Sequence, residues 1–349
     1  MGKEVFSSVG QFVPSMETGL VEIAPALLGK VSGVRRVLPW IIGLLSFFAL
    51  IFIVLHFGSP ERIVELARSA QPAWLLLAVV AQLVTYVCAA LVWRQALRRA
   101  GHPRSLRTLV PLGIAKLFAD QVLPSGGISG TMLVVRGLIR RRVPLGAAMA
   151  AMVAGLVSYN IAYLAIVLVG AGILRLHNRV NLPLLIGVAV FVVVTVAIPT
   201  AVLGLKRWGN RRPIPWLSGL FGVTALLRAL VEAPTDLLHR PGLLAQTAGL
   251  QLGIFLLDAL TLWLAFRCLG EVPETWVIFV SFAIASMTAT IAPIPLGLGT
   301  FEAGSVGVLS FLGVSIEAAL AGTLLLRGLT FWLPMLPGIW LARREFGHL

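Results

Sequence analysis

Among the ionisable side chains inside long apolar segments of this 349-residue chain, five are candidates for function: Asp120, Arg136, Asp258, Glu302 and Arg327. A charge at the centre of a bilayer costs about 2.5 to 3.5 kcal/mol on insertion scales, so residues of this kind are functional candidates by default. Two kinds of chemistry suit them. A guanidinium binds phosphate through two parallel hydrogen bonds, and a buried carboxylate coordinates a cationic group or carries a proton.

Two Pro/Gly interruptions accompany these charges. The first reads LPSGGISG over residues 123–130, and the second reads PIPLGLGTFE over residues 293–302. A break of this kind produces half-helices whose N-terminal ends carry partial positive charge and favour anions. Glu302 falls near such an end. We therefore add the residues that shape both breaks to the candidate substrate-binding set: Pro124, Gly126, Gly127, Pro295, Gly297 and Gly299.

Each charge also has a structural explanation, in which two buried groups neutralise one another. Arg327 either pairs with Glu302, which locks the second stretch in place, or binds a phosphate. Asp120 faces the same choice, with Lys116 or Arg136 as its partner. The two explanations of the Glu302 and Arg327 positions have equal weight at this point.

Asp258 has no partner near it in the sequence. It either lines a cavity or pairs with Arg327, and we favour the cavity. The chain contains no zinc-protease, Walker or nucleophile-elbow motif, and its two cysteines lie far apart inside apolar segments without metal-ligand spacing. We therefore expect no catalytic residue, no metal site and no cofactor.

The composition indicates that the chain lies in a lipid bilayer rather than in water. The chain is 58% hydrophobic and 12% charged, with a mean hydropathy of +0.95. It has too little polar surface to cover a water-soluble globule. The net charge of +14 comes from basic clusters at the ends of apolar runs, where anionic headgroups and the positive-inside rule account for them. Nucleic acid is therefore not an expected partner.

We predict an all-α polytopic integral membrane protein. Its single transmembrane domain covers residues 39–344, between a cytoplasmic tail at 1–38 and a short cytoplasmic tail at 345–349, with an interfacial helix at 213–240. The basic clusters place both termini in the cytoplasm and the protein in the cytoplasmic (inner) membrane. Six apolar runs are long enough to cross the bilayer: 39–57, 73–97, 145–174, 182–205, 242–266 and 318–341.

Residues 106–139 do not fit a single membrane helix. The segment is too long for one span and too short for two, and arginines stand at both of its ends. We expect a re-entrant hairpin that enters and leaves at the cytoplasmic face; the alternative is a proline-kinked full span. Residues 275–312 predict a second hairpin that enters from the opposite face, because the connector 313–317 has no basic residue.

The two hairpins are also related in sequence. A shift of 171 residues aligns Pro124 with Pro295 and Gly126 with Gly297. Together with the opposite entry faces, this indicates an inverted repeat. Many transporters have this plan, in which discontinuous helices meet near the bilayer midplane and form the substrate site.

The second stretch reads P-x-P-x-G-x-G-x-x-E, followed by Leu325-Leu326-Arg327 and the aromatic pair Phe331-Trp332. In these features it resembles the transmembrane region of the lysylphosphatidylglycerol synthase/flippase family, also called UPF0104. The first stretch with Arg136 resembles that family's first signature, and the resemblance covers residues 40–342. It implies a membrane region that translocates or binds phospholipid, beside a separate soluble aminoacyltransferase. Because this chain stops at Leu349, we expect a standalone unit without that enzyme.

The expected function is therefore flippase-like translocation of a phospholipid or another anionic or zwitterionic lipid, through a midplane cavity between the hairpins. Arg327, Arg136 and the half-helix N-termini would hold the phosphate. The carboxylates of Asp120, Asp258 and Glu302 would coordinate a cationic headgroup or carry a coupling proton. The alternatives are an integral-membrane lipid-modifying enzyme and a lipid-binding accessory subunit of an envelope-lipid synthase. A homo-oligomer and a lipid-synthase partner both stay open.

Overall fold

The computed structural model describes residues 61, 65–66, 68, 70–122, 127–179, 182–208, 241–291 and 297–346. The regular elements within these ranges are all helical. Outside them lie the predicted tail 1–38, span 39–57 and interfacial helix 213–240. In chain order the helices are α4 (Pro72–Arg99), α5 (Leu106–Val122), α6 (Ile128–Arg140), α7 (Leu145–Leu176), α8 (Leu182–Trp208), α10 (Pro241–Cys268), α11 (Thr275–Ile291), α12 (Thr300–Phe311), α13 (Ile316–Arg327), the π-helix η3 (Gly328–Trp332) and α14 (Leu333–Phe346).

Four helical segments of the described chain are long and apolar enough to cross a membrane. They are α4, α7, α10 and the continuous helix Ile316–Glu345, which joins α13, η3 and α14. Helix α8 covers the predicted span 182–205, and its part Leu182–Ala197 is a shorter apolar helix. The chain is therefore an α-helical multi-pass membrane protein, as its composition predicts. The total of six spans stays a prediction.

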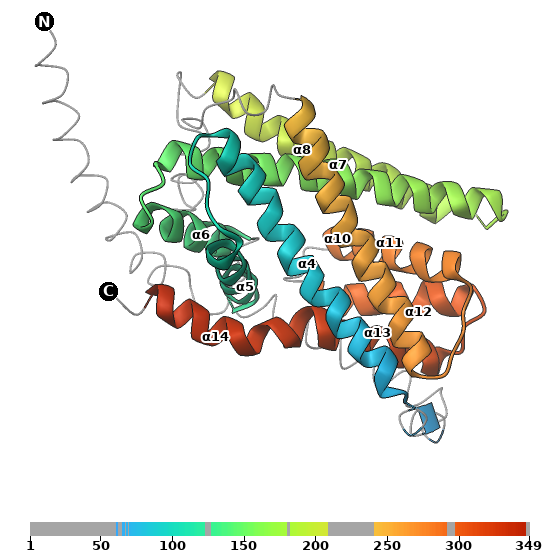
Figure 1. The fold of residues 1–349 in the computed structure, drawn as a ribbon. Coiled ribbons are helices and arrows are strands. Elements are labelled where there is room, and N and C mark those ends of the chain that lie inside the picture. The colour runs from blue at the N-terminus through green and yellow to red at the C-terminus, as the bar shows by residue number, and fades with distance from the viewer. Residues whose placement is uncertain are drawn as a thin grey trace, which may run out of the picture.

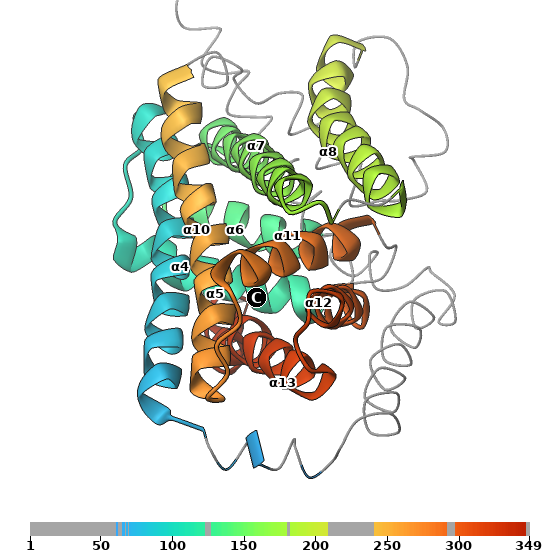
Figure 2. The same ribbon diagram turned by 90° about the vertical axis from the view of Figure 1, so that its right-hand side faces the viewer.

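Helices α4 and α10 run side by side along one face of the molecule, in front in Figure 1 and at the left edge in Figure 2. The backbone N–H of Gln71, just before α4, donates to the carbonyl of Cys268 at the end of α10 at 2.8 Å, so the two helices are antiparallel. Ala78 and Ala81 are buried on α4, where small side chains let two helix backbones approach closely. Large apolar residues of α4 such as Leu76 are exposed, as suits a face that meets lipid.

Two pairs of short helices lie on opposite sides of α4 and α10. Helices α5 and α6 pack against each other on one side, and α11 and α12 on the other (Figure 1). The apolar core is divided in the same way. One buried cluster includes Leu109 and Leu138, and a second includes Ile278 and Leu309. The long helix α7 contacts both pairs and joins the two halves.

Each Pro/Gly interruption separates two helices, so neither 106–139 nor 275–312 forms a single helix, as predicted. Gly127 (φ 86°) precedes α6 and Gly299 (φ 78°) precedes α12, in backbone conformations that glycine adopts most readily. At 1.5 Å per residue α6 and α12 are each about 20 Å long or less, short of a hydrocarbon core of about 30 Å. Re-entrance from one face and the inverted repeat stay predictions.

Glycines bring the two helices of each pair close together. A Cβ on Gly137 of α6 would lie 2.5 Å from the Leu112 side chain of α5. A Cβ on Gly304 of α12 would lie 2.3 Å from Thr288 Oγ1 and 3.2 Å from the Ala285 backbone of α11. A larger side chain at either position would therefore push the paired helices apart.

The last span connects the two halves. Its first part, α13, packs against α12, and its final part, α14, packs against α5. A Cβ on Gly338 of α14 would lie 2.6 Å from Phe118 Cβ of α5, so this contact is also tight. The π-helix η3 lies between α13 and α14 and begins directly after Arg327. The sequence did not predict this change of helical winding.

Candidate functional site

Glu302 and Arg327 form a buried ion pair between α12 and α13. The guanidinium Nε of Arg327 donates to Oε1 of Glu302 at 2.7 Å. The Glu302 side chain is 1% exposed and that of Arg327 is 15% exposed. The sequence left two alternatives for Arg327, an ion pair with Glu302 or the binding of a phosphate. The structure contains the ion pair, and phosphate binding stays a prediction.

The second oxygen of Glu302 closes the first turn of α12. Oε2 accepts a hydrogen bond of 2.7 Å from the backbone N–H of Gly299, which has no partner within the helix. A glutamate three positions into a helix that reaches back to the cap in this way is half of a capping box. Its charge also lies at the positive end of the helix dipole. Both oxygens of Glu302 thus occupy positions that favour an anion.

Aromatic rings border the Arg327 guanidinium. Its central carbon Cζ lies 5.0 Å from the ring centroid of Phe301 and 5.3 Å from that of Phe331, within the range of cation–π attraction. Phe301 comes from the start of α12 and Phe331 from the π-helix. Single-turn π-helical segments are frequent at functional sites. The sequence pattern marked Phe331 but missed the contribution of Phe301.

A second polar link joins the same two helices. The hydroxyls of Ser305 and Thr323 are 2.8 Å apart, and both residues are fully buried. Ser305 lies three residues after Glu302, and Thr323 lies four residues before Arg327. Such spacings place each hydroxyl on the same face of its helix as the charge. Sequence reasoning missed this pair, although the spacing is a signal that could have found it.

Asp120 is held by a different set of groups in the first helix pair. Lys116, one turn earlier on α5, donates from Nζ to Oδ2 at 2.5 Å. The backbone N–H of Gly130, in the first turn of α6, donates to Oδ1 at 2.8 Å. Of the two partners that the sequence offered, Asp120 therefore takes Lys116. Arg136 lies further along α6 and is partly buried.

The predicted glycines shape backbone at the two helix starts. Gly127 stands immediately before α6, and its carbonyl accepts a 2.8 Å hydrogen bond from the Thr131 hydroxyl. Gly297 has a φ of 61°, and a Cβ there would lie 2.5 Å from the Ala289 Cβ of α11. These glycines therefore act through the chain path rather than through a side chain. Outside the described residues lie Pro124, Gly126 and Pro295.

Asp258 meets an amide on α4. Gln82 Nε2 donates to Asp258 Oδ1 at 2.8 Å and also lies 3.1 Å from the Thr261 hydroxyl. The pairing of Asp258 with Arg327 that the sequence left open is not formed, because Arg327 pairs with Glu302. Asp258 has no partner near it in the sequence, as expected, and its position in a cavity stays a prediction. Gln82 is 176 residues away in the chain, and no local pattern pointed to it.

The predicted charges thus gather in more than one place. Glu302 and Arg327 come together between α12 and α13, whereas Asp120 and Asp258 each have partners of their own. The Glu302 and Arg327 pair consists of two opposite charges with a buried carboxylate, lies at a helix N-terminus and contacts two aromatic side chains. We take this pair and its immediate contacts as the candidate functional site.

Comparisons with known proteins identify the family of the chain. The family described as "Lysylphosphatidylglycerol synthase TM region" matches residues 40–338, which include both helix pairs and the candidate site. A "UPF0104 membrane protein" of Methanothermobacter thermautotrophicus is 23% identical over 317 residues, covering 86% of this chain and 92% of that protein. The chain therefore belongs to the lysylphosphatidylglycerol synthase TM region family, a membrane family linked to lipid handling.

Proposed function

We propose that this chain translocates a phospholipid, or the headgroup end of one, across the membrane as a flippase does. The observation that carries the proposal is the buried Glu302 and Arg327 pair at the start of α12. An ion pair in the interior of a membrane protein is weak evidence for stability, because a well-packed apolar pair is often as stable. A role in binding gives a reason for the charges to be there.

The donors of the site favour an anion, and the carboxylate of Glu302 is the anion that they bind in this structure. An arginine and the backbone N–H at a helix start are two of the commonest phosphate ligands in proteins. Both donate to the Glu302 carboxylate, at 2.7 Å each. A phosphodiester has the charge and the acceptor oxygens to replace it. In this scheme the carboxylate occupies the anion site when no lipid is bound, and the substrate phosphate displaces it from Arg327 and Gly299.

The surroundings of the site favour a lipid over a soluble phosphate compound. The pair lies in a chain of apolar membrane helices, and the large apolar side chain of Trp332, five residues after Arg327, is exposed as suits a surface that meets lipid. A headgroup can therefore reach the polar pair while its acyl chains stay in the bilayer. No step in this scheme makes or breaks a covalent bond in the lipid. Asp120 and Asp258 remain candidates for a coupling proton.

Reconstitution into liposomes that contain a fluorescent phospholipid tests the proposal. We expect the wild-type chain to move the labelled lipid between leaflets and Glu302→Gln and Arg327→Gln to lose that movement. Glu274→Gln is a matched control, because Glu274 is an exposed carboxylate whose indole partner, Trp276, can also donate to an amide oxygen. Equal lipid movement in wild type, Glu302→Gln and empty vesicles would contradict the proposal.

A double variant separates transport from a purely structural lock. Glu302→Gln with Arg327→Gln removes both charges, so no buried charge is left without a partner. If the pair only fastens α12 to α13, stability and lipid movement should recover together in the double variant. We expect the unfolding midpoint to recover and lipid movement to stay lost, because the anion-binding guanidinium is gone.

A further inference from the structure

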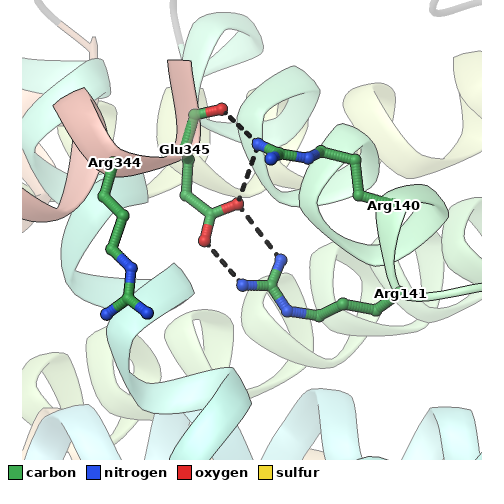
Figure 3. Close-up of a pocket in the computed structure, with 4 residues that line it drawn as sticks. All are labelled: Arg140, Arg141, Arg344 and Glu345. Carbon is green, nitrogen blue, oxygen red and sulfur yellow. Dashed lines mark hydrogen bonds and ion pairs between the residues drawn. The ribbon is translucent and has the colours of Figure 1, made fainter. Parts of the chain in front are cut away.

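A small pocket opens where the end of α6 meets the end of α14. It has a volume of about 300 Å³ and is lined by Arg140, Arg141, Arg344 and Glu345 (Figure 3). Three guanidinium groups face one carboxylate there, so the lining has an excess of positive charge. In the sequence analysis these arginines indicated only the cytoplasmic face, and Glu345 fell in the predicted C-terminal tail.

Two of the arginines are fixed in place by α14. Arg141 binds both carboxylate oxygens of Glu345, at 2.6 Å and 3.1 Å, and also donates to the carbonyl of Gly137 at 2.7 Å. Arg140 donates to the backbone carbonyl of Glu345 at 2.7 Å and is 3.9 Å from its carboxylate. The pocket is therefore assembled before any ligand arrives, which lowers the entropy that binding must overcome.

Arg344 makes no hydrogen bond or ion pair with the other lining residues, although its charge acts on Glu345 from a distance. Its guanidinium lies on the opposite side of Glu345 from Arg140 and Arg141 (Figure 3). The guanidinium carbon of Arg344 lies 5.8 Å from the ring centroid of Trp340. Because Arg141 already occupies both Glu345 oxygens, Arg344 and the half-exposed Arg140 can donate to a further anion.

An exposed apolar stripe leads up to this pocket along α14. Leu336, Trp340 and Arg344 follow one another at intervals of four residues, so they share one face of the helix. Leu336 is 75% exposed and Trp340 is 63% exposed. Tryptophan is enriched at the level of lipid headgroups. An acyl chain can lie along Leu336 and Trp340 while its phosphate reaches Arg344.

We propose that this pocket binds the phosphate group of an anionic phospholipid at the membrane surface. Basic pockets between transmembrane helices on the cytoplasmic side bind anionic headgroups in this way. The site is separate from the Glu302 and Arg327 pair and does not depend on the proposed transport function. A lipid bound here contacts both α6 and α14, and so bridges the first helix pair and the last span.

Native mass spectrometry of the full chain in detergent, with phosphatidylglycerol and phosphatidylcholine at equal concentration, tests the site. The variant Arg140→Gln with Arg344→Gln removes two charges and leaves the Arg141 and Glu345 pair intact. We expect phosphatidylglycerol affinity to fall roughly thirtyfold, since each basic residue near the surface contributes about fivefold. The matched control is Arg99→Gln with Arg343→Gln, two exposed arginines that do not line the pocket.

The outcomes are distinct. Selective loss of phosphatidylglycerol in the pocket variant, with binding kept in the control, supports the site. An equal loss in both double variants would mean that general surface charge, and not the pocket, binds the lipid, which would overturn the proposal. Release of the lipid by millimolar inorganic phosphate would mean that the pocket takes free phosphate instead. Should the double variant not fold, Arg344→Gln alone applies the same test, because Arg344 has no ion pair to lose within the pocket.

Discussion

In both helix pairs a carboxylate accepts a hydrogen bond from a backbone amide at the start of the second helix. In the pair α5 and α6, the carboxylate of Asp120 accepts a hydrogen bond from the Gly130 amide at 2.8 Å. In the pair α11 and α12, the carboxylate of Glu302 accepts one from the Gly299 amide at 2.7 Å. Each helix N-terminus is therefore covered by a negative charge, which its free amides and dipole favour.

The two carboxylates differ in their basic partners and in their burial. Lys116 comes from the same helix as Asp120, one turn away, and their side chains are 26% and 16% exposed. Arg327 comes from α13, 25 residues after Glu302, and their side chains are 15% and 1% exposed. The first pair is local, and both of its side chains are partly exposed. The second connects two helices, and its carboxylate is fully buried.

The stability of the fold should depend more on the Glu302 and Arg327 pair than on the Asp120 and Lys116 pair. A partly exposed pair one turn apart contributes little to stability, because water and salt screen it. A buried pair contributes little as a pair, yet breaking it is costly because one charge is left without a partner. The same chemistry should therefore give a weak effect in α5 and α6 and a strong effect in α12 and α13.

The largest effect should come from Glu302→Gln. The amide oxygen can still accept from Gly299, but the positive charge of Arg327 remains buried without its counter-charge. We expect a loss of about 3 to 5 kcal/mol in the free energy of unfolding. Titration of the purified chain with SDS in mixed micelles, followed by tryptophan fluorescence, measures it.

If Asp120→Asn destabilises the chain as much as Glu302→Gln does, the two pairs do not differ in importance. The double variant Glu302→Gln with Arg327→Gln tests the cause of the loss. We expect that variant to be more stable than Glu302→Gln alone, because it also removes the positive charge that Glu302 balances.

The next effect should come from the close contact inside the second pair. Gly304→Ala places a Cβ against Thr288 and the Ala285 backbone, which cannot move aside without shifting α11. We expect a loss of about 1 to 3 kcal/mol from overpacking. Thermal unfolding of purified wild type and variant in the same detergent compares them.

Gly307→Ala is the control, because a Cβ on Gly307 meets nothing within 4 Å. It should gain a few tenths of a kcal/mol to about 1 kcal/mol, since alanine restricts the unfolded chain. If both glycine variants lose stability equally, the loss does not come from the contact with α11, because alanine favours a helix more than glycine does and Gly307 makes no such contact.

A smaller effect is expected from Asp120→Asn in the first pair. Asparagine keeps an acceptor for the Gly130 amide and loses only the attraction to Lys116. We expect a loss of less than about 1 kcal/mol. The same SDS titration at low and at high ionic strength checks the cause. The loss should shrink in high salt, where the partly exposed wild-type pair is screened, while that of Glu302→Gln should persist.

The sequence predicted the helices closely where bilayer thickness and charge set their limits. The predicted span 145–174 became Leu145–Leu176, and the predicted span 242–266 became Pro241–Cys268. A membrane helix must be long enough to cross the hydrocarbon and must end where polar residues begin, so nearby residues determine both of its ends. The Pro/Gly breaks could be predicted because they too depend only on nearby residues.

Contacts between distant segments could not be predicted. Gln82 meets Asp258 only because α4 and α10 are antiparallel and in one particular register. Arg141, just after α6, pairs with Glu345 across 204 residues. Nor does the local pattern indicate that the helix widens into a π-helix directly after Arg327. Each of these depends on tertiary packing, which overrides local preference.

The smallest effect on stability should come from Asp258→Asn, which serves as a reference outside both helix pairs. Among the described residues Asp258 meets the Gln82 amide and no base, and asparagine keeps an oxygen that can accept the same hydrogen bond. The substitution leaves no opposite charge behind, so we expect a change of less than about 1 kcal/mol in the SDS titration. A loss as large as that of Glu302→Gln would mean that burial alone, without a charged partner, decides the effect. If Asp258 carries a coupling proton, lipid movement in liposomes should lose its dependence on a pH gradient while the fold stays intact, which separates a functional carboxylate from a structural one.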